Sequence, residues 1–208
     1  MKTILCYGDS NTWGYDPATG ERFGPGARWP GVLARELGDG YAVIEEGLNG
    51  RTTVWDDPID PHRNGREYLV PCLESHAPLD LVAIALGVND LKARLALSAS
   101  DIADGAGALV ETAQKSATGP DGGPPAVLLV APPPVGDLGE ADEMFEGALE
   151  KSRRFSLHYR RVADKYGCGL LDLAGIVSAS ALDGVHFEAS EHAKIGREAA
   201  SRVKDLLR

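Results

Sequence analysis

The apolar stretch Leu81-Val82-Ala83-Ile84-Ala85-Leu86, followed at once by Gly87-Val88-Asn89-Asp90, decides the fold class. Six consecutive apolar residues, without alternating polar ones, indicate a strand that is covered on both faces. Shorter strand-like runs occur at residues 4–7, 42–46, 127–131 and 169–172. The sequence therefore predicts five short strands, most of them buried on both faces.

Helical patterns separate these strands and predict a mainly parallel sheet between two helical layers. The third helix is expected to begin at an Asp101 N-cap, and the fourth to be one solvent-facing amphipathic helix. We expect an α/β fold, a three-layer α/β/α sandwich that forms a single domain over residues 1–208. The expected helices span residues 29–37, 66–76, 101–116, 143–166 and 191–207.

Composition excludes several classes of partner. The chain has 21 Lys and Arg against 31 Asp and Glu, a net charge of −10, and such a surface repels nucleic acid and anionic lipid. No apolar stretch approaches the roughly 20 residues of a membrane span, and no signal-peptide pattern opens the chain. We therefore expect a cytoplasmic protein without nucleic-acid or membrane partners. Cys6, Cys72 and Cys168 show no ligand spacing, so we expect reduced thiols, no metal and no cofactor.

In an open parallel sheet, ligands bind beyond the carboxyl ends of the strands. After the first predicted strand comes Gly8-Asp9-Ser10-Asn11, in which Gly8 would permit a sharp turn and Ser10 would lie where strand gives way to helix. A hydroxyl there is a candidate nucleophile if a base accepts its proton. The alternative is that Ser10 or Asn11 only caps the helix.

The segments after the second and third strands offer hydrogen-bond donors for an oxyanion. Gly47 and Gly50, in Gly47-Leu48-Asn49-Gly50, both allow backbone N–H groups to face one space, and the residues alone do not choose between them. Asn89 offers a side-chain N–H, while Asp90 would hold its loop through backbone hydrogen bonds. The alternatives are a flexible turn and a capping Asn/Asp pair.

The segment Asp183-Gly184-Val185-His186 lies near the C-terminus, after the fifth strand. His186 suits a general base near neutral pH, and Asp183 would fix its tautomer. A surface histidine beside an aspartate is the alternative. Nucleophile, oxyanion donors, base and orienting acid thus follow successive strands, which is the set that acyl transfer requires.

With these residues in place, the chain resembles the SGNH (GDSL-type) hydrolases. The four letters of that name match Ser10, Gly50, Asn89 and His186. Further resemblance lies in Glu45-Glu46-Gly47-Leu48, Arg51-Thr52-Thr53, Asp56-Asp57-Pro58, Pro78-Leu79-Asp80-Leu81-Val82, Pro132-Pro133-Pro134, Phe145-Glu146-Gly147 and Asp183-Gly184-Val185-His186-Phe187.

The resemblance implies a flavodoxin-like strand order and assigns roles to the site residues. Ser10 becomes the nucleophile, His186 the base and Asp183 its partner. The N–H groups of Ser10 and Gly50, with the Asn89 side chain, become the oxyanion hole.

The chain looks closest to bacterial arylesterases, including the mycobacterial acyltransferase type. This implies hydrolysis of short-chain aryl and acetyl esters, with acetylated sugars and acyl transfer to alcohols within range, and assembly into homo-oligomers. Asn11, where Leu is usual, and Gly50, where the acyltransferase type has Ala, depart from the pattern beside the acyl pocket.

Several residues near the site could shape a pocket for a small acyl or aryl group. Trp13, Tyr15 and Trp29 would wall it, or Trp13 and Trp29 would instead pack the first helix on the sheet. The expected substrate contacts are Asp9, Asn11, Trp13, Tyr15, Val88, Lys92 and Val185.

The acidic, proline-containing segment 56–65 carries Asp57, Asp60 and His62, which one hypothesis makes metal ligands. We favour an ordered loop that frames the site or meets a neighbouring subunit. The other histidines, His76, His158 and His192, have no carboxylate or serine context in the sequence, so we expect them to be structural or solvated.

A rival function is a non-catalytic, flavodoxin-like module that binds a small molecule, such as a phosphate or nucleotide, at the strand-end loops. Against it, the chain has no Gly-x-Gly-x-x-Gly after the first strand and no Gly-Lys-Ser/Thr loop.

Overall fold

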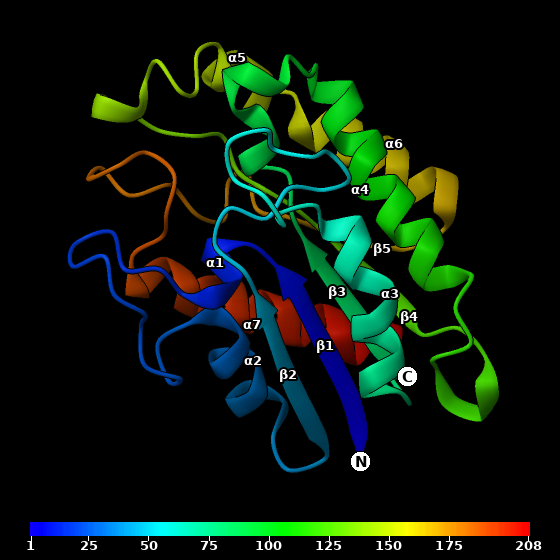
Figure 1. Ribbon diagram of the computed structural model, residues 1–208. Helices are drawn as coiled ribbons and strands as arrows, with labels where there is room; N and C mark the ends of the chain where they lie inside the picture. The colour runs from blue at the N-terminus through cyan, green and yellow to red at the C-terminus, as the bar shows by residue number, and fades with distance from the viewer.

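A computed structural model describes residues 1–208 and places a five-stranded parallel sheet at the centre of the molecule (Figure 1). The strand order is β2-β1-β3-β4-β5, so both the α/β fold and the flavodoxin-like order are confirmed. The strands are β1 (Lys2–Gly8), β2 (Tyr41–Gly47), β3 (Leu81–Ala85), β4 (Ala126–Ala131) and β5 (Gly169–Asp172).

Helices cover both faces of the sheet, as the alternation of elements predicts. α2 and α7 pack on one face, and α3, α4 and α6 on the other (Figure 1). No helix has the length and apolar character that crossing a bilayer requires. The helices are α1 (Ser10–Trp13), α2 (Trp29–Leu37), α3 (Gly65–His76), α4 (Ala99–Gln114), α5 (Ala148–Ser152), α6 (Phe155–Tyr166) and α7 (Ala189–Leu206), with short 3-10 turns at Asn89–Leu91, Ala93–Leu95, Pro120–Gly122 and Gly139–Ala141.

The central strand β1 is anchored from both sides. Ile4 and Cys6 belong to the core beneath α2 and α7, whereas Leu5 and Tyr7 belong to the core beneath α3, α4 and α6. All four side chains are fully buried, and burying one large apolar side chain contributes about 1.5–3 kcal/mol. The carboxyl end of β1 is therefore held firmly in place.

That end of β1 lies where the chain reverses its direction of winding. β1 pairs with β2 on one side and with β3 on the other, so successive connections leave β1 toward opposite edges of the sheet. In open α/β sheets this switch point is where ligands bind, and the segment that follows it is Asp9-Ser10.

The expected helix over residues 143–166 is not continuous. Residues 143–147 form turns, and α5 and α6 follow as separate helices. Gly147 adopts a left-handed conformation (φ 74°), which a right-handed helix cannot include. The amphipathic pattern continues through the break because both helices place apolar residues against the core, including Ala148 and Phe155.

The start of α4 also differs from the expectation. Its N-cap is Ser98, not Asp101. The Ser98 side chain accepts a hydrogen bond from the Asp101 N–H, and Asp101 accepts in return from the Ser98 N–H, at 3.0 Å. This is a capping box, in which the acidic residue stands at the third helical position, so the prediction chose the wrong member of the pair.

Candidate active site

Ser10 is the first residue of α1, directly after the end of β1. The N-cap of α1 is Asp9, whose carboxylate accepts a hydrogen bond from the Asn11 N–H at 2.9 Å. The capping alternative for Ser10 and Asn11 is therefore wrong, and the Ser10 hydroxyl is left available for other partners. Ser10 is only 5% exposed.

Gly8 serves close packing at this junction. Its φ is not left-handed, so the sharp turn expected here depends on the missing side chain and not on a special backbone conformation. A Cβ at Gly8 would lie 2.0 Å from the Thr12 hydroxyl oxygen and 2.8 Å from the Ala85 carbonyl oxygen. Only glycine allows α1 to fold back this tightly onto the ends of β1 and β3.

Three side chains form a continuous hydrogen-bonded chain at this edge of the sheet. Ser10 Oγ lies 2.9 Å from His186 Nε2, and His186 Nδ1 lies 2.7 Å from Asp183 Oδ2. The chain segments that meet here are 176 residues apart in sequence. A hydroxyl, an imidazole and a carboxylate in this order can act as nucleophile, base and orienting acid.

Asp183 is held ionised. Partial burial raises its pKa, but hydrogen bonds from the His186 ring and from the N–H groups of His186 and Val185 outweigh burial and bring the pKa to about 2. The two backbone bonds are each 2.9 Å long. A charged Asp183 keeps the Nδ1 proton of His186 in place and leaves Nε2 free to accept the serine proton.

Tyr15 covers one face of the His186 ring. The two ring centroids are 4.2 Å apart, at an interplanar angle of 32°. Tyr15 was expected to line the pocket; its contact with the imidazole is an additional feature that the sequence did not indicate. A tyrosine ring in this position restricts the orientation of the imidazole.

The structure separates the two glycines that the residues alone left open. Gly50 has φ 80° and lines the same cleft as Ser10. Gly47 instead packs against α1, since a Cβ there would lie 2.1 Å from the Trp13 amide nitrogen. Gly50 is therefore the better candidate for an oxyanion donor.

The Asn89 side chain lies in the same cleft. Its Nδ2 donates one hydrogen bond to the Arg51 carbonyl oxygen, at 3.2 Å. This bond fixes the amide plane and leaves the second N–H of the group for a ligand.

Arg51 ties the strand ends together and was missed by the sequence reasoning. Its guanidinium is buried and donates to the carbonyl oxygens of Gly8 (2.8 Å) and Glu46. It also stacks 4.1 Å from the centre of the Tyr7 ring. Arg51 thus joins the loop of Gly50 to the ends of β1 and β2. The sequence Gly50-Arg51-Thr52-Thr53 does not indicate this role, because a single charged residue there is equally typical of an exposed loop.

Two further carboxyl groups near the site are fully buried. Asp90 accepts hydrogen bonds from the Thr53 N–H (3.0 Å) and the Thr53 hydroxyl, so it ties the loop of Thr53 to the turn that carries Asn89. Burial raises the pKa of Asp90 to about 7, against the effect of these bonds. Burial likewise raises the pKa of Asp9 to about 6, against the Asn11 N–H and the nearby His186.

The cleft that contains Ser10 has a volume of about 380 Å³. Of the expected contacts, Tyr15, Lys92 and Val185 line it. Four of its lining residues were not expected: Asn49, Ala141, Met144 and Phe145. The sequence pattern predicted that Phe145 lies on a helix, so it gave no indication that this residue lies in a loop that lines the cleft.

The remaining expected contacts lie elsewhere. Asp9, Asn11 and Val88 line a separate cavity of about 30 Å³, together with Trp29, which has room for little more than one water molecule. Trp13 lines neither space and is covered by the Arg22 guanidinium, 5.2 Å from the ring centre. The cleft is therefore the only one of these two spaces that could receive an ester.

The loop over residues 56–65 is held by ion pairs. The buried Asp57 carboxylate lies 2.8 Å from Lys92 Nζ and 2.8 Å from Arg94 Nη2, and Asp60 contacts the same two cations at 3.0 Å. These bonds hold the pKa of Asp57 well below its usual range, although burial opposes them. Two cations stand where a metal ion would need to bind, so the arrangement supports a loop that frames the cleft through Lys92.

The histidines outside the triad differ from one another. His192 is fully buried and its Nδ1 accepts from the Trp29 N–H at 3.3 Å; burial, and then the charge of His186, lowers its pKa to about 4. His158 borders a small pocket between α4 and α6. His76 does have a carboxylate partner, Glu46, at 2.9 Å, which the sequence could not show because the two residues lie 30 positions apart.

Comparison with known proteins points to one family. The model of the GDSL-like lipase/acylhydrolase family matches residues 6–194. The native aryl esterase of M. smegmatis is 42% identical, with 100% of each chain covered and a TM-score of 0.95; its inhibitor-bound form gives 41% identity, the same coverage and the same TM-score. The carbohydrate acetylesterase Est24 of Sinorhizobium meliloti is 39% identical, with 99% of this chain and 100% of that chain covered and a TM-score of 0.94. The search among curated proteins gives no match.

Proposed function

The chain belongs to the GDSL-like lipase/acylhydrolase family and is a carboxylic ester hydrolase, and we propose that it hydrolyses short-chain aryl and acetyl esters through an acyl-enzyme on Ser10. The observation that carries the proposal is the Ser10–His186–Asp183 chain, with contacts of 2.9 and 2.7 Å, whose three residues line a cleft of about 380 Å³.

In the first step, Ser10 Oγ attacks the ester carbonyl while His186 Nε2 accepts the serine proton. The imidazolium that forms is stabilised by the charged Asp183 carboxylate. His186 then donates the proton to the leaving alcohol or phenol, and the acyl group remains on Ser10. Water, activated by the same imidazole, releases the acid and restores the hydroxyl.

The negative charge of the tetrahedral intermediate needs fixed donors. We assign this role to the N–H groups of Ser10 and Gly50 and to the Asn89 side chain. Donors that are already oriented cost no reorganisation when the charge develops. Arg51 provides that orientation, through its carbonyl bond to Asn89 and its guanidinium bonds to the strand ends.

The cleft favours small, neutral esters. Tyr15, Met144 and Phe145 supply apolar wall, while the one cation, Lys92, is already paired with Asp57 and Asp60. The cleft therefore has no free positive charge for an anionic substrate. The aryl esterase and carbohydrate acetylesterase among the similar structures support aryl acetates and acetylated sugars as the first substrates to test.

The test is turnover of p-nitrophenyl esters of increasing acyl length, and of a peracetylated sugar, by wild type and Ser10→Ala. We expect the highest kcat/KM with acetate, a steep fall with longer chains, and no turnover by the variant. Equal turnover by Ser10→Ala would contradict Ser10 as the nucleophile, and no turnover by wild type with any ester would favour the rival binding module. Adding an alcohol in water tests acyl transfer: a new ester in the products supports it, and acid alone restricts the enzyme to hydrolysis.

A further inference from the structure

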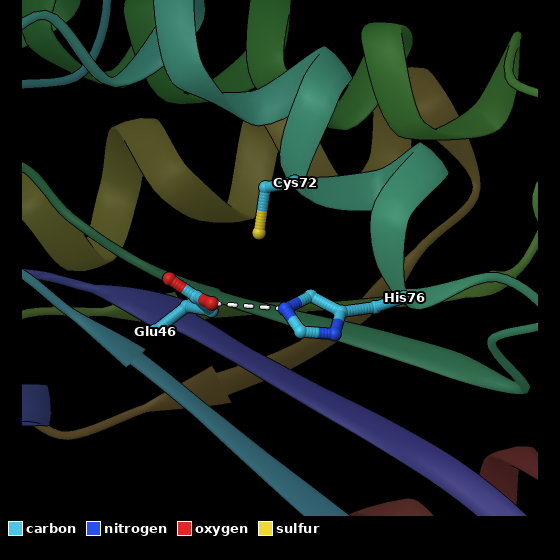
Figure 2. Close-up of side chains that lie close together, drawn as sticks. All are labelled: Glu46, Cys72 and His76. Atoms are coloured by element: carbon cyan, nitrogen blue, oxygen red, sulfur yellow. Dashed lines mark hydrogen bonds and ion pairs between the residues drawn. The ribbon is translucent and has the colours of Figure 1, made fainter.

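We propose that Glu46, Cys72 and His76 form a binding site for a divalent cation of the zinc class, separate from the ester-binding cleft. Cys72 and His76 stand on α3, four residues apart and hence on one face of the helix, and Glu46 stands on the edge strand β2. Figure 2 shows the three side chains pointing toward one another. None of them lines the cleft that contains Ser10.

The spacing of the three donor atoms suits a shared ion. Glu46 Oε1 and His76 Nε2 are 2.9 Å apart, and all three donor atoms lie within 4.8 Å of one another. Ligand atoms around a tetrahedral zinc ion are about 3.5 Å apart, given bonds of about 2.0–2.3 Å. Small side-chain rotations therefore bring the three atoms into place without moving the backbone.

The donor set selects the kind of metal. Zinc takes thiolate, imidazole and carboxylate ligands together, whereas magnesium and calcium require oxygen ligands. Binding exchanges the proton of the Cys72 thiol for the ion and releases that proton to solvent. The deprotonated set, one thiolate, one carboxylate and a neutral imidazole, carries a charge of −2 that a divalent ion neutralises.

The site is open on one side. The side chains of Glu46 and His76 are 22% and 30% exposed, while Cys72 is fully buried beneath them. An ion can thus enter from solvent and keep water as its fourth ligand. Burial, and then the Glu46 carboxylate, raises the pKa of the Cys72 thiol to about 12, and the Arg51 guanidinium offsets this only in part, so a bound ion has to displace the thiol proton.

Such an ion would strengthen the link between two elements that are otherwise joined by packing and by the Glu46–His76 contact. It would join α3 to the carboxyl-terminal end of β2, just before the segment that carries Gly50. It would not supply chemistry to the ester reaction, because it lies outside the cleft. The expected consequence is a gain in stability: at a hundredfold excess of ion over Kd, the melting temperature should rise by about 5 °C.

The experiment is titration of the full-length protein, stripped with chelator and kept reduced, with Co²⁺ as a spectroscopic probe. We expect tetrahedral d–d bands together with a thiolate-to-cobalt charge-transfer band, both abolished by added Zn²⁺. Cys72→Ser should remove the charge-transfer band, and Glu46→Gln or His76→Gln should weaken binding by at least about tenfold, since even losing an outer-shell partner costs about 10–100-fold.

Two matched controls make the result decisive. Cys168→Ser removes the half-buried thiol outside the cluster and should leave the spectrum unchanged. Ser10→Ala should bind cobalt as wild type does, so the site stands or falls independently of the proposed esterase activity. A wild type without a charge-transfer band at millimolar cobalt, or a band that survives Cys72→Ser but not Cys168→Ser, would overturn the proposal.

Discussion

The loop that carries Asp183 and the turn that carries Asp90 shift the pKa of an aspartate in opposite directions. Each aspartate lies at the carboxyl edge of the sheet and accepts three hydrogen bonds from one or two neighbours. Yet the pKa of Asp183 is about 2 and that of Asp90 is about 7.

The difference lies in burial and in the kind of partner. The Asp183 side chain is 29% exposed and faces the imidazole of His186, which becomes a cation in the proposed mechanism. Asp90 is 1% exposed, its donors belong to the neutral Thr53, and the nearby charge of Asp9 raises its pKa further. Counting hydrogen bonds therefore does not assign a role: Asp183 is suited to stabilise charge, and Asp90 to hold two loops in register.

Asp183→Asn gives the largest expected effect. The amide keeps the shape but favours the wrong imidazole tautomer and cannot stabilise the imidazolium, so kcat should fall by about 10⁴-fold. The measurement is steady-state hydrolysis of p-nitrophenyl acetate, with circular dichroism to establish that the fold is intact. A loss of less than tenfold would mean that Asp183 is no more than a loop anchor, like Asp90.

Asp90→Asn tests the structural role of Asp90 through the free energy of unfolding. The folded protein keeps protons on Asp9 and Asp90 up to about pH 6 and about pH 7, whereas an unfolded chain releases them near pH 3.8. Between these values the folded state binds more protons, so the free energy of unfolding should fall as pH rises from about 4 to about 8. One pK unit corresponds to about 1.4 kcal/mol, so Asp90 accounts for about 4 kcal/mol at most.

Urea unfolding across that pH range measures this effect. In Asp90→Asn, which mimics the protonated acid, most of the fall should disappear and only the Asp9 part should remain. Asp183→Asn should leave the fall intact, because the stability that Asp183 contributes is present above pH 3.8 and is lost only as pH drops toward its folded value of about 2. An unchanged slope in Asp90→Asn would show that Asp90 is ionised at neutral pH.

Asn89→Ala tests whether Asn89 contributes to catalysis, whereas its neighbour Asp90 contributes to structure. Removing one oxyanion donor typically costs about 3 kcal/mol, a hundredfold or more in kcat. The KM for p-nitrophenyl acetate should change little, because the lost bond forms mainly in the transition state. A purely structural Asn89 would instead lower the melting temperature and raise KM.

Among these substitutions, Tyr15→Leu should have the smallest effect on kcat. An aromatic contact of this kind is worth about 0.5–1.5 kcal/mol, so kcat should fall by roughly two- to tenfold. Tyr15→Phe keeps the ring over His186 and is the matched control. If Tyr15→Phe were as impaired as Tyr15→Leu, the phenol oxygen rather than the ring would carry the effect.

Much of the fold and the triad could be predicted because their signals are local in sequence. The continuous apolar run at residues 81–86 identifies a strand covered on both faces, and the strand-end position then brings Ser10, Asn89 and His186 to one edge. Where local signals competed, prediction failed: Gly147 interrupts an otherwise helical pattern, and Ser98 and Asp101 both qualify as helix caps.

The features that could not be predicted depend on contacts between distant segments. Thr53 meets Asp90 across 37 residues, and Asp57 meets Lys92 across 35. Arg51 gains its role only when β1 and β2 lie side by side. Each is a charged or polar residue whose sequence context is that of an ordinary surface position, and burial, which decides its function, is a property of the folded chain.

Labelling with a serine-directed phosphonate tests the central claim most directly. Intact-mass measurement of the protein, followed by peptide mapping, should find one adduct, on Ser10, formed in step with the loss of esterase activity. His186→Ala should slow the labelling strongly, and Ser10→Ala should abolish it. An adduct at another residue, or the same labelling in Ser10→Ala, would contradict the assignment of Ser10 as the nucleophile.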